Sequence, residues 1–325
     1  MGKSSKIAVL GGGSWATAIV KMLSENLDTI GWYMRSAYAI EHIKRNKHNP
    51  SYLSSAELHP EQLDLSDDIN TIVAKYDILI FAIPSAFLKS ELEKLSVSLE
   101  GKIIFSAIKG IVPETGVIIG EYFHEYFQVP YENIGVLTGP CHAEEVAMER
   151  LSYLTLACQD EAKAEELSTY VSGRYIKTKI SDDIIGTEYA AMLKNIYAIA
   201  AGIAHGLGYG DNFQSVLMSN SIREMKRFIK KVHHMKRNIN NSAYLGDLLV
   251  TGYSTFSRNI GKGYTVKSAQ LEMSMIAEGY YASKSAYKIN KKNGAKTPII
   301  NAVYNVLYSG KEAKDEFEKL THKLD

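Results

Sequence analysis

A single lysine interrupts an otherwise uncharged helical segment in the second half of the chain. Residues 189–204 contain one charged residue, Lys194. Its neighbours three and four positions away on a helix are Ala190, Ala191, Tyr197 and Ala198. Such small neighbours leave room for a ligand, and burial lowers the pKa of an amine, which suits proton exchange near neutrality. The alternative is a lysine whose chain extends from a buried helix to solvent, and periodicity alone leaves both open.

A glycine-rich turn stands near the N-terminus. The run Gly11-Gly12-Gly13-Ser14-Trp15-Ala16 lies between an apolar run at residues 6–11 and a helical pattern at residues 14–25. Gly11 permits a tight turn, and Gly13 lets the backbone approach a pyrophosphate. The N–H groups at the start of the helix then face that anion. The turn therefore predicts a dinucleotide site, and the alternative is a glycine turn without a ligand.

The acid that commonly binds the ribose of NAD is absent from its usual place, about twenty residues beyond the glycines. Met34-Arg35-Ser36 occupies that place, at the end of the second apolar run. Arg35 has the charge and geometry to bind a 2′-phosphate. We therefore expect NADPH to bind at least as well as NADH, unless Arg35 is only a surface charge.

Apolar runs alternate with helical patterns over the first half of the chain. Strands are expected at residues 29–34, 77–83, 102–107, 134–138 and 152–158, with helices that include residues 114–127 and 161–171. This alternation predicts a Rossmann-like α/β domain with a mostly parallel sheet. Beyond residue 182 the pattern is helical, with breaks at Gly206, Gly208 and Gly210. We expect a dinucleotide-binding domain at residues 1–181 and an all-helical substrate-binding domain at residues 182–325.

Composition limits the partners and the compartment. Lysine and arginine number 37 against 36 acidic residues, which gives no bulk electrostatic reason for nucleic-acid or membrane binding. The basic run at residues 226–237 is better interpreted as a solvated helix face than as an anion site. Cys141 and Cys158 are too few for a disulfide framework and lack C-x-x-C spacing. Without a signal segment or a long apolar run, we expect a cytoplasmic protein with no metal.

Five segments together resemble the bacterial NAD(P)-dependent glycerol-3-phosphate dehydrogenases. They are G-G-G-S-W-A at residues 11–16, A-I-K-G at 107–110, L-T-G-P-C-H-A-E-E at 137–145, L-K-N-I-Y-A-I-A-A-G-I-A at 193–204, and S-R-N at 257–259. Each is weakly specific alone, but their order and spacing make the set highly specific. The resemblance implies a C-terminal domain like that of 6-phosphogluconate dehydrogenase. It also implies reversible NAD- or NADP-dependent hydride transfer between dihydroxyacetone phosphate and sn-glycerol 3-phosphate, for phospholipid synthesis.

The resemblance also implies roles for individual residues. Lys194 matches the proton-transferring lysine, Lys109 the second active-site lysine, and Asp247 an aspartate beside the substrate. A second cation near Lys194 would lower its pKa further. The alternative for Asp247 is a helix-terminal cap. Cofactor contacts are implied for Ser14, Trp15, Lys109, Ala143, Arg258 and Glu278, in addition to those predicted above for Gly11, Gly13 and Arg35. Substrate contacts are implied for Lys109, Gly139, Cys141, Lys194, Asp247, Ser257, Arg258 and Asn259, where the arginine provides a planar fork for phosphate.

The sequence departs from this family in two places. Cys141-His142 stands where members carry serine or threonine followed by phenylalanine, and a thiol is the poorer hydrogen-bond partner. A nucleophile and base pair is disfavoured here because adjacent side chains point apart. After Asn259 the loop is short, and Lys262 is a candidate replacement for its missing charge. Rival interpretations are another two-domain hydroxy-acid dehydrogenase and a non-catalytic nucleotide sensor. The sequence leaves assembly as a homodimer open.

Overall fold

The computed structural model describes residues 5–253 and 278–325. Contacts between Cα atoms divide the chain into two compact units. The first contains Met1–Ile108 and Ile119–Ile184, and the second contains Lys109–Ile118 and Ile185–Asp325. The segment that follows Ile108 therefore has its contacts in the second unit. Within the described ranges, no helix has both the length and the apolar character needed to cross a membrane.

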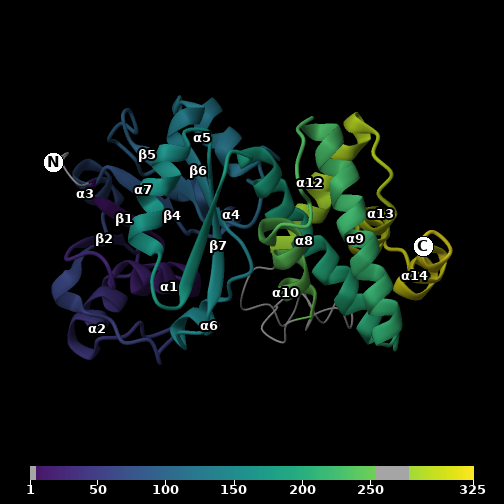
Figure 1. The fold of residues 1–325 in the computed structure, drawn as a ribbon, viewed down its shortest axis with the longest axis horizontal. Coiled ribbons are helices and arrows are strands. Elements are labelled where there is room, and N and C mark those ends of the chain that lie inside the picture. Colours follow the sequence, from purple (N-terminus) through teal and green to yellow (C-terminus); the bar gives the residue numbers. More distant parts are fainter. Residues whose placement is uncertain (1–4, 254–277) are drawn as a thin grey trace. The chain divides into compact units, whose positions relative to one another are not determined.

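The first unit is built on an eight-stranded sheet in the order β3-β2-β1-β4-β5-β6-β7-β8 (Figure 1). The strands are β1 Ile7–Leu10, β2 Ile30–Tyr33, β3 Leu63–Ser66, β4 Ile78–Phe81, β5 Ile103–Ser106, β6 Ile134–Thr138, β7 Ser152–Cys158 and β8 Ile176–Ser181. Every neighbouring pair is parallel except β6 and β7. The predicted, mostly parallel sheet is confirmed. The sequence did not predict β3 and β8, because these edge strands are partly polar.

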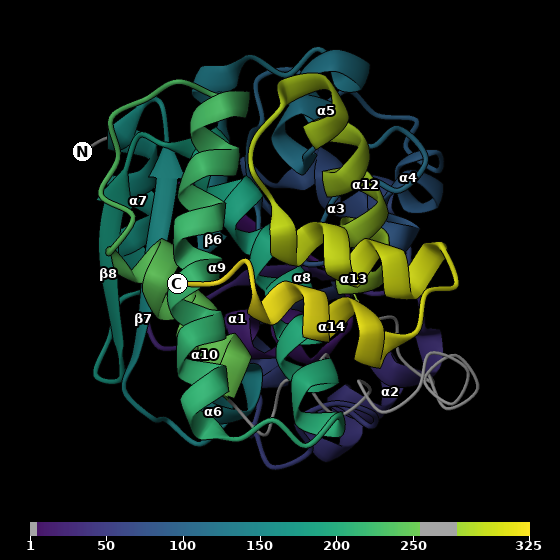
Figure 2. The same cartoon turned by 90° about the vertical axis from the view of Figure 1, so that its right-hand side faces the viewer.

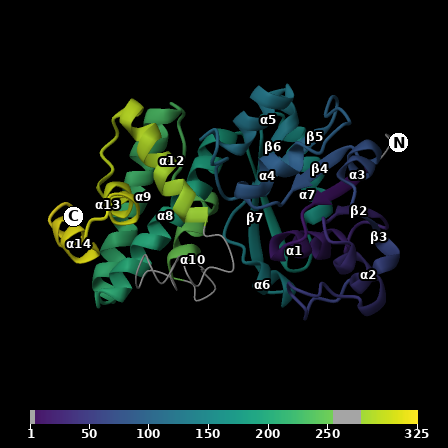
Figure 3. The same cartoon turned by 180° about the vertical axis from the view of Figure 1, so that it is seen from behind.

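Helices connect the strands of the first unit. They are α1 Ser14–Leu23, α2 Ala37–Asn46, α3 Ile69–Lys75, α4 Ser85–Leu92, α5 Ile119–Phe127, α6 Ala143–Ala147 and α7 Glu161–Val171. The strand order grows outward from β1 in both directions, so right-handed crossovers place helices on both faces of the sheet (Figure 3). The helix predicted at residues 114–127 begins only at Ile119. Its first residues form a turn instead, in which Gly116 has a φ of 73° and donates to the Val112 carbonyl.

The described part of the second unit is helical (Figure 2). It contains α8 Ile184–Gly206, α9 Asp211–Val232, the π-helical turn η3 Ser242–Gly246, α10 Asp247–Tyr253, α12 Glu278–Asn293, α13 Pro298–Tyr308 and α14 Ala313–Thr321. The apolar and small residues of α8 itself face every side of the helix, which is the pattern of a buried helix. As predicted, glycines separate α8 from α9, and Gly208 has a φ of 84°.

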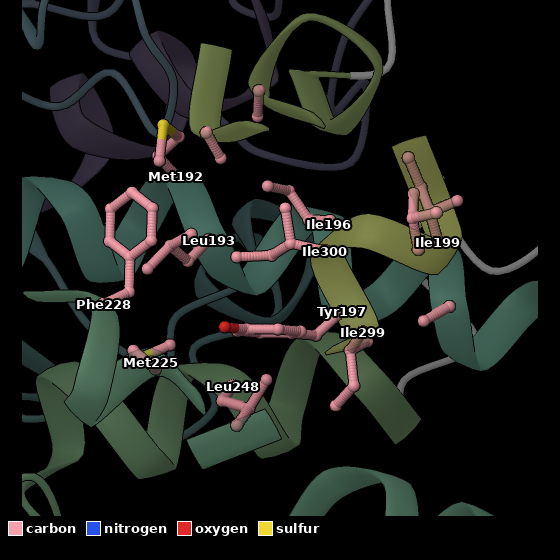
Figure 4. Packing of buried hydrophobic residues seen from close by; sticks show 14 of the residues in the cluster. Met192, Leu193, Ile196, Tyr197, Ile199, Met225, Phe228, Leu248, Ile299 and Ile300 are labelled. Atoms are coloured by element: carbon pink, nitrogen blue, oxygen red, sulfur yellow. The ribbon is translucent and has the colours of Figure 1, made fainter. Parts of the chain in front are cut away.

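Helix α8 is the centre of the second unit's core. Its Leu193 and Tyr197 are fully buried and pack among residues such as Phe228, Leu248 and Ile299, which come from three other helices (Figure 4). Burial of each such side chain stabilises the fold by about 1.5–3 kcal/mol. This packing holds α8 in place, and with it every polar side chain that α8 carries.

Candidate active site

Lys194 lies in the middle of α8 with its ammonium group turned into the second unit. The residue is 5% exposed. Its Nζ donates to Oδ1 of Asp247 at 2.7 Å and to Oγ1 of Thr251 at 2.8 Å. The alternative of a lysine that reaches solvent is therefore wrong. A buried ammonium with two defined acceptors has a fixed position, which a proton donor needs.

Asp247 joins Lys194 to a second lysine. The Nζ of Lys109 lies 3.3 Å from Oδ2 and 3.4 Å from Oδ1 of the Asp247 carboxylate, whose side chain is 2% exposed. Lys109 begins the segment Lys109–Ile118, which has its contacts in the second unit. Asn195 holds that segment, because its Nδ2 donates to the Lys109 carbonyl oxygen at 2.8 Å. The structure thus brings together the three residues implied to be catalytic.

Burial and charge set the protonation of this cluster. Burial lowers the pKa of Lys194 to about 8, the charge of Lys109 lowers it as well, and Asp247 opposes both. For Asp247, burial raises the pKa, but the charges of Lys109 and Lys194 outweigh burial and leave it below the usual value. The expected lowering of the Lys194 pKa, including the contribution of a second cation, is confirmed. At neutral pH the carboxylate is ionised and Lys194 is close to its titration point.

Two further residues hold this cluster, and sequence reasoning missed their roles. The Thr251 hydroxyl accepts from Lys194 and donates to the Asp247 carbonyl oxygen at 2.7 Å. Its spacing of four residues from Asp247 on α10 was the available signal. Asn195 follows Lys194 directly, and its Nδ2 also donates to the Ala191 carbonyl oxygen. Neither residue stands out until Asp247 is known to face α8.

A change of helical type positions Asp247. The residue ends the π-helical turn η3 and begins α10, with φ −69° and ψ −31°. Single π-helical turns frequently occur at functional sites. The side chain of Asp247 binds two ammonium groups, so a helix cap does not account for its contacts.

The glycine-rich turn of the first unit has the geometry of a phosphate cradle. Gly11 has a φ of 133°, and a Cβ there would lie 2.5 Å from the Ala82 carbonyl oxygen. A Cβ on Gly13, the residue before α1, would meet nothing within 4 Å. The Gly11 carbonyl accepts from Nε1 of Trp32 at 2.7 Å, which holds the turn. The space beside Gly13 therefore adjoins the start of a ten-residue helix, where an anion is stabilised.

A pocket of about 280 Å³ continues from this turn. Its lining includes Gly13, Arg35, Ser36, Phe87 and Glu91. The guanidinium carbon of Arg35 lies 5.4 Å from the centre of the Phe87 ring. A flat aromatic ring and a planar guanidinium are the surfaces on which a purine base stacks. Together with the cradle, these residues fit the adenosine and pyrophosphate parts of a dinucleotide.

Comparison with known proteins shows the family of the chain. The family model for the N-terminus of NAD-dependent glycerol-3-phosphate dehydrogenase matches residues 6–164, and the model for its C-terminus matches residues 183–318. Glycerol-3-phosphate dehydrogenase NAD(P)+ of an Exiguobacterium species is 35% identical over 97% of this chain and 95% of its own length. The chain belongs to the NAD-dependent glycerol-3-phosphate dehydrogenase family. The resemblance inferred from five segments is confirmed.

Other members support this family assignment. The enzyme of the same name from Lysinibacillus sphaericus is 33% identical over 98% of this chain and 96% of its own length. Among solved structures, glycerol-3-phosphate dehydrogenase of Coxiella burnetii has a TM-score of 0.87 at 25% identity, covering 98% of this chain and 99% of its own. Since these matches span both units, the order of a sheet unit followed by a helical unit is that of the family.

The remaining residues implied by the family fall in several places. Ser14 and Trp15 begin α1, Ala143 begins α6, and Glu278 begins α12. Gly139 follows β6 with a φ of 121°. Ser257, Arg258 and Asn259, with the short loop after them, lie outside the described residues. Cys141, where the chain departs from the family, is 7% exposed and forms no disulfide with Cys158. The described ranges contain no group of three or more His, Cys, Asp or Glu side chains placed to hold a metal.

Proposed function

We propose that this protein catalyses the reversible NAD(P)-dependent interconversion of dihydroxyacetone phosphate and sn-glycerol 3-phosphate, and so supplies glycerol 3-phosphate for phospholipid synthesis. One observation carries the proposal. Two lysines share the buried carboxylate of Asp247, and Lys194 has a pKa of about 8. A group with this pKa both gives and takes a proton near neutral pH, as reversible reduction of a ketone requires.

In the direction of reduction, Lys194 donates a proton to the ketone oxygen as the adjacent carbon is reduced, which yields a secondary alcohol. A bound nicotinamide supplies the hydride for this step and accepts it in the reverse direction. An ammonium has three N–H donors, and Asp247 and Thr251 accept two of them. The third is left for the substrate oxygen. Asp247 orients Lys194, and Lys109 keeps the carboxylate ionised and adds positive charge beside the substrate.

The nucleotide and phosphate contacts follow the family. Gly11, Gly13, Ser14 and Trp15 would hold the pyrophosphate, and Arg35 would bind a 2′-phosphate, so that NADP or NAD serves as cofactor. Ala143, Glu278 and Arg258 would add contacts to it. Ser257, Arg258 and Asn259 would clamp the substrate phosphate, and the family resemblance implies substrate contacts for Gly139 and Cys141 as well. Alanine substitution of each of these residues, with leucine in place of alanine at Ala143 and with separate titration of cofactor and substrate, tests these proposals.

A substrate panel tests the reaction itself. Oxidation of NADPH and NADH is followed at 340 nm with dihydroxyacetone phosphate, with unphosphorylated dihydroxyacetone, and with a series of keto acids. We expect turnover of dihydroxyacetone phosphate alone. Turnover of a keto acid instead identifies another hydroxy-acid dehydrogenase. Tight nucleotide binding without turnover of any ketone identifies a non-catalytic sensor. Lys194→Ala in the same assay controls for contaminating activity.

The wider predictions also remain proposals. We propose that residues 1–181 bind the dinucleotide, that residues 182–325 bind the triose phosphate, and that the protein works in the cytoplasm. The two cysteines are buried and form no disulfide with each other, which is consistent with a reducing compartment. Light scattering on the purified chain checks the predicted homodimer, because one chain has a mass of 36.1 kDa.

A further inference from the structure

Glu91 places a buried carboxylate in the wall of the pocket that also contains Arg35. The residue lies on α4 and is 5% exposed. The Tyr33 hydroxyl donates to its Oε2 at 2.5 Å, and the Nζ of Lys94 donates to its two oxygens at 2.9 and 2.8 Å. An acidic side chain with three hydrogen bonds is a built feature of this wall.

The carboxylate of Glu91 is ionised at neutral pH. Burial raises its pKa, but hydrogen bonds from Lys94 and Tyr33, together with the charges of Lys94 and Arg35, leave the pKa below its usual value. Arg35 contributes to this lowering, and both side chains line the same pocket.

Lys94 offsets this negative charge inside the pocket only in part. The side chain of Lys94 is 51% exposed, whereas that of Glu91 is 7% exposed. Solvent and salt screen an exposed charge much more than a buried one. Lys94 is also absent from the residues that line the pocket. Glu91 is among the residues that line the pocket and Lys94 is not, so the carboxylate acts on a ligand there more strongly than the ammonium does.

The two nucleotides differ in charge at one position. NADP carries a 2′-phosphate with a charge of about −1.5 to −2 at neutral pH, if its second pKa is near 6 as in other phosphate monoesters. NAD carries a neutral hydroxyl there. Arg35 attracts the phosphate and Glu91 repels it, while neither charge discriminates strongly against the hydroxyl. The end of β2 has Met34-Arg35-Ser36 and no acid, so Glu91 supplies the acidic charge of this pocket from another element.

We propose that Glu91 is a specificity-determining residue, whose carboxylate opposes Arg35 and limits the preference for 2′-phosphorylated nucleotides, so that NADH remains usable. This inference rests on the proposed function, in which the pocket holds the adenosine end of the cofactor.

Binding of two cofactor fragments to the full chain tests the inference without catalysis. Calorimetry gives the dissociation constants of 2′,5′-ADP and 5′-AMP for the wild type and for Glu91→Gln. We expect Glu91→Gln to raise the preference for 2′,5′-ADP by roughly three- to tenfold at low ionic strength, and by less as salt is added. Glu93→Gln is the matched control, because Glu93 is exposed on the same chain segment and lies outside the pocket. The ratio of the two dissociation constants in Glu93→Gln should equal that of the wild type.

Each outcome has one meaning. An unchanged preference in Glu91→Gln overturns the inference, and so does equal weakening of both fragments, which would mean that Glu91 binds the adenosine they share. If Glu91→Gln fails to fold, Lys94→Gln replaces it, and a lower preference for 2′,5′-ADP is then expected. Arg35→Ala distinguishes failure of the inference about Glu91 from failure of the proposed cofactor site. If it removes the preference while Glu91→Gln does not change it, only the inference fails. If the wild type binds neither fragment, the proposed cofactor site fails.

Discussion

At the scale of single residues, the site depends on a carboxylate between two cations. Burial of any one of these charges alone would be costly, and the trio is tolerable because Asp247 contacts both lysines. The same arrangement makes Lys194 easy to deprotonate, since burial and Lys109 both oppose its charge. Asp247 therefore stabilises the cluster, while burial and Lys109 keep Lys194 able to release its proton.

Removal of the proton donor tests this assignment. We expect Lys194→Ala to lower kcat by roughly two to four powers of ten, because a positioned acid contributes about that much. Lys194→Arg should be similarly impaired, since a guanidinium does not deprotonate near neutrality. The fragment 5′-AMP, for which we propose a site in the first unit, should bind both variants as it binds the wild type. Near-normal turnover in either variant would show that another group donates the proton.

The pH profile follows from the pKa of about 8 for Lys194. Reduction needs the ammonium form, so its kcat should fall as pH rises through about 8, while oxidation needs the amine and should rise over the same range. Asp247 raises the pKa of Lys194, so Asp247→Asn should move both limbs to lower pH. Rates in both directions between pH 6 and 10 measure this. Limbs that move to higher pH in the variant would contradict it.

At the scale of elements, the sequence predicts those strands and helices whose own residues carry a clear pattern. The apolar runs of β1 and β4 and the uncharged stretch of α8 depend on their own residues, and the structure has them where expected. Edge strand β8 has alternating polar residues, and hydrogen bonds to β7 identify it only in three dimensions. The roles of Thr251 and Glu91 were not predicted from the sequence for a related reason. Thr251 matters because it binds Lys194, and Glu91 because it binds Tyr33, and both partners are distant in sequence.

The close contact of α12 with α8 gives a prediction about elements. A Cβ on Gly279 would lie 2.6 Å from the carbonyl oxygen of Asn195, the residue after Lys194. Because that atom is backbone, α12 or α8 must shift. We expect Gly279→Ala to destabilise the fold by about 1–3 kcal/mol and to lower kcat by displacing Lys194. Denaturant unfolding and the 340 nm assay measure the two effects. Gly294→Ala, at a φ of 67° in an open turn, separates general strain from this contact.

At the scale of the whole molecule, stability should depend on another buried carboxyl group, that of Glu224. Glu224 on α9 is fully buried and accepts from the backbone N–H groups of Ile299 and Ile300, both at 2.9 Å, at the start of α13. These two hydrogen bonds therefore hold the start of α13 against α9. Burial raises its pKa to about 8 from 4.5, although the two N–H donors and Arg227 oppose the shift. The folded protein thus binds a proton that the unfolded chain releases between these two pH values.

The contribution of Glu224 to the free energy of unfolding should therefore fall as pH rises. A raised pKa contributes stability that is complete below about pH 4.5 and is lost as pH rises to about 8, with a slope of at most about 1.4 kcal/mol per pH unit. Lys194 has the opposite shift, but its effect falls between about 8 and 10.5, outside this window. Glu224→Gln cannot titrate, so its free energy of unfolding should vary less between pH 5 and 8 than that of the wild type. Urea unfolding across that range measures the difference, with Glu318→Gln on the exposed face of α14 as the control. Parallel curves for wild type and Glu224→Gln would mean that Glu224 stays ionised in the folded protein and that its two N–H donors outweigh its burial.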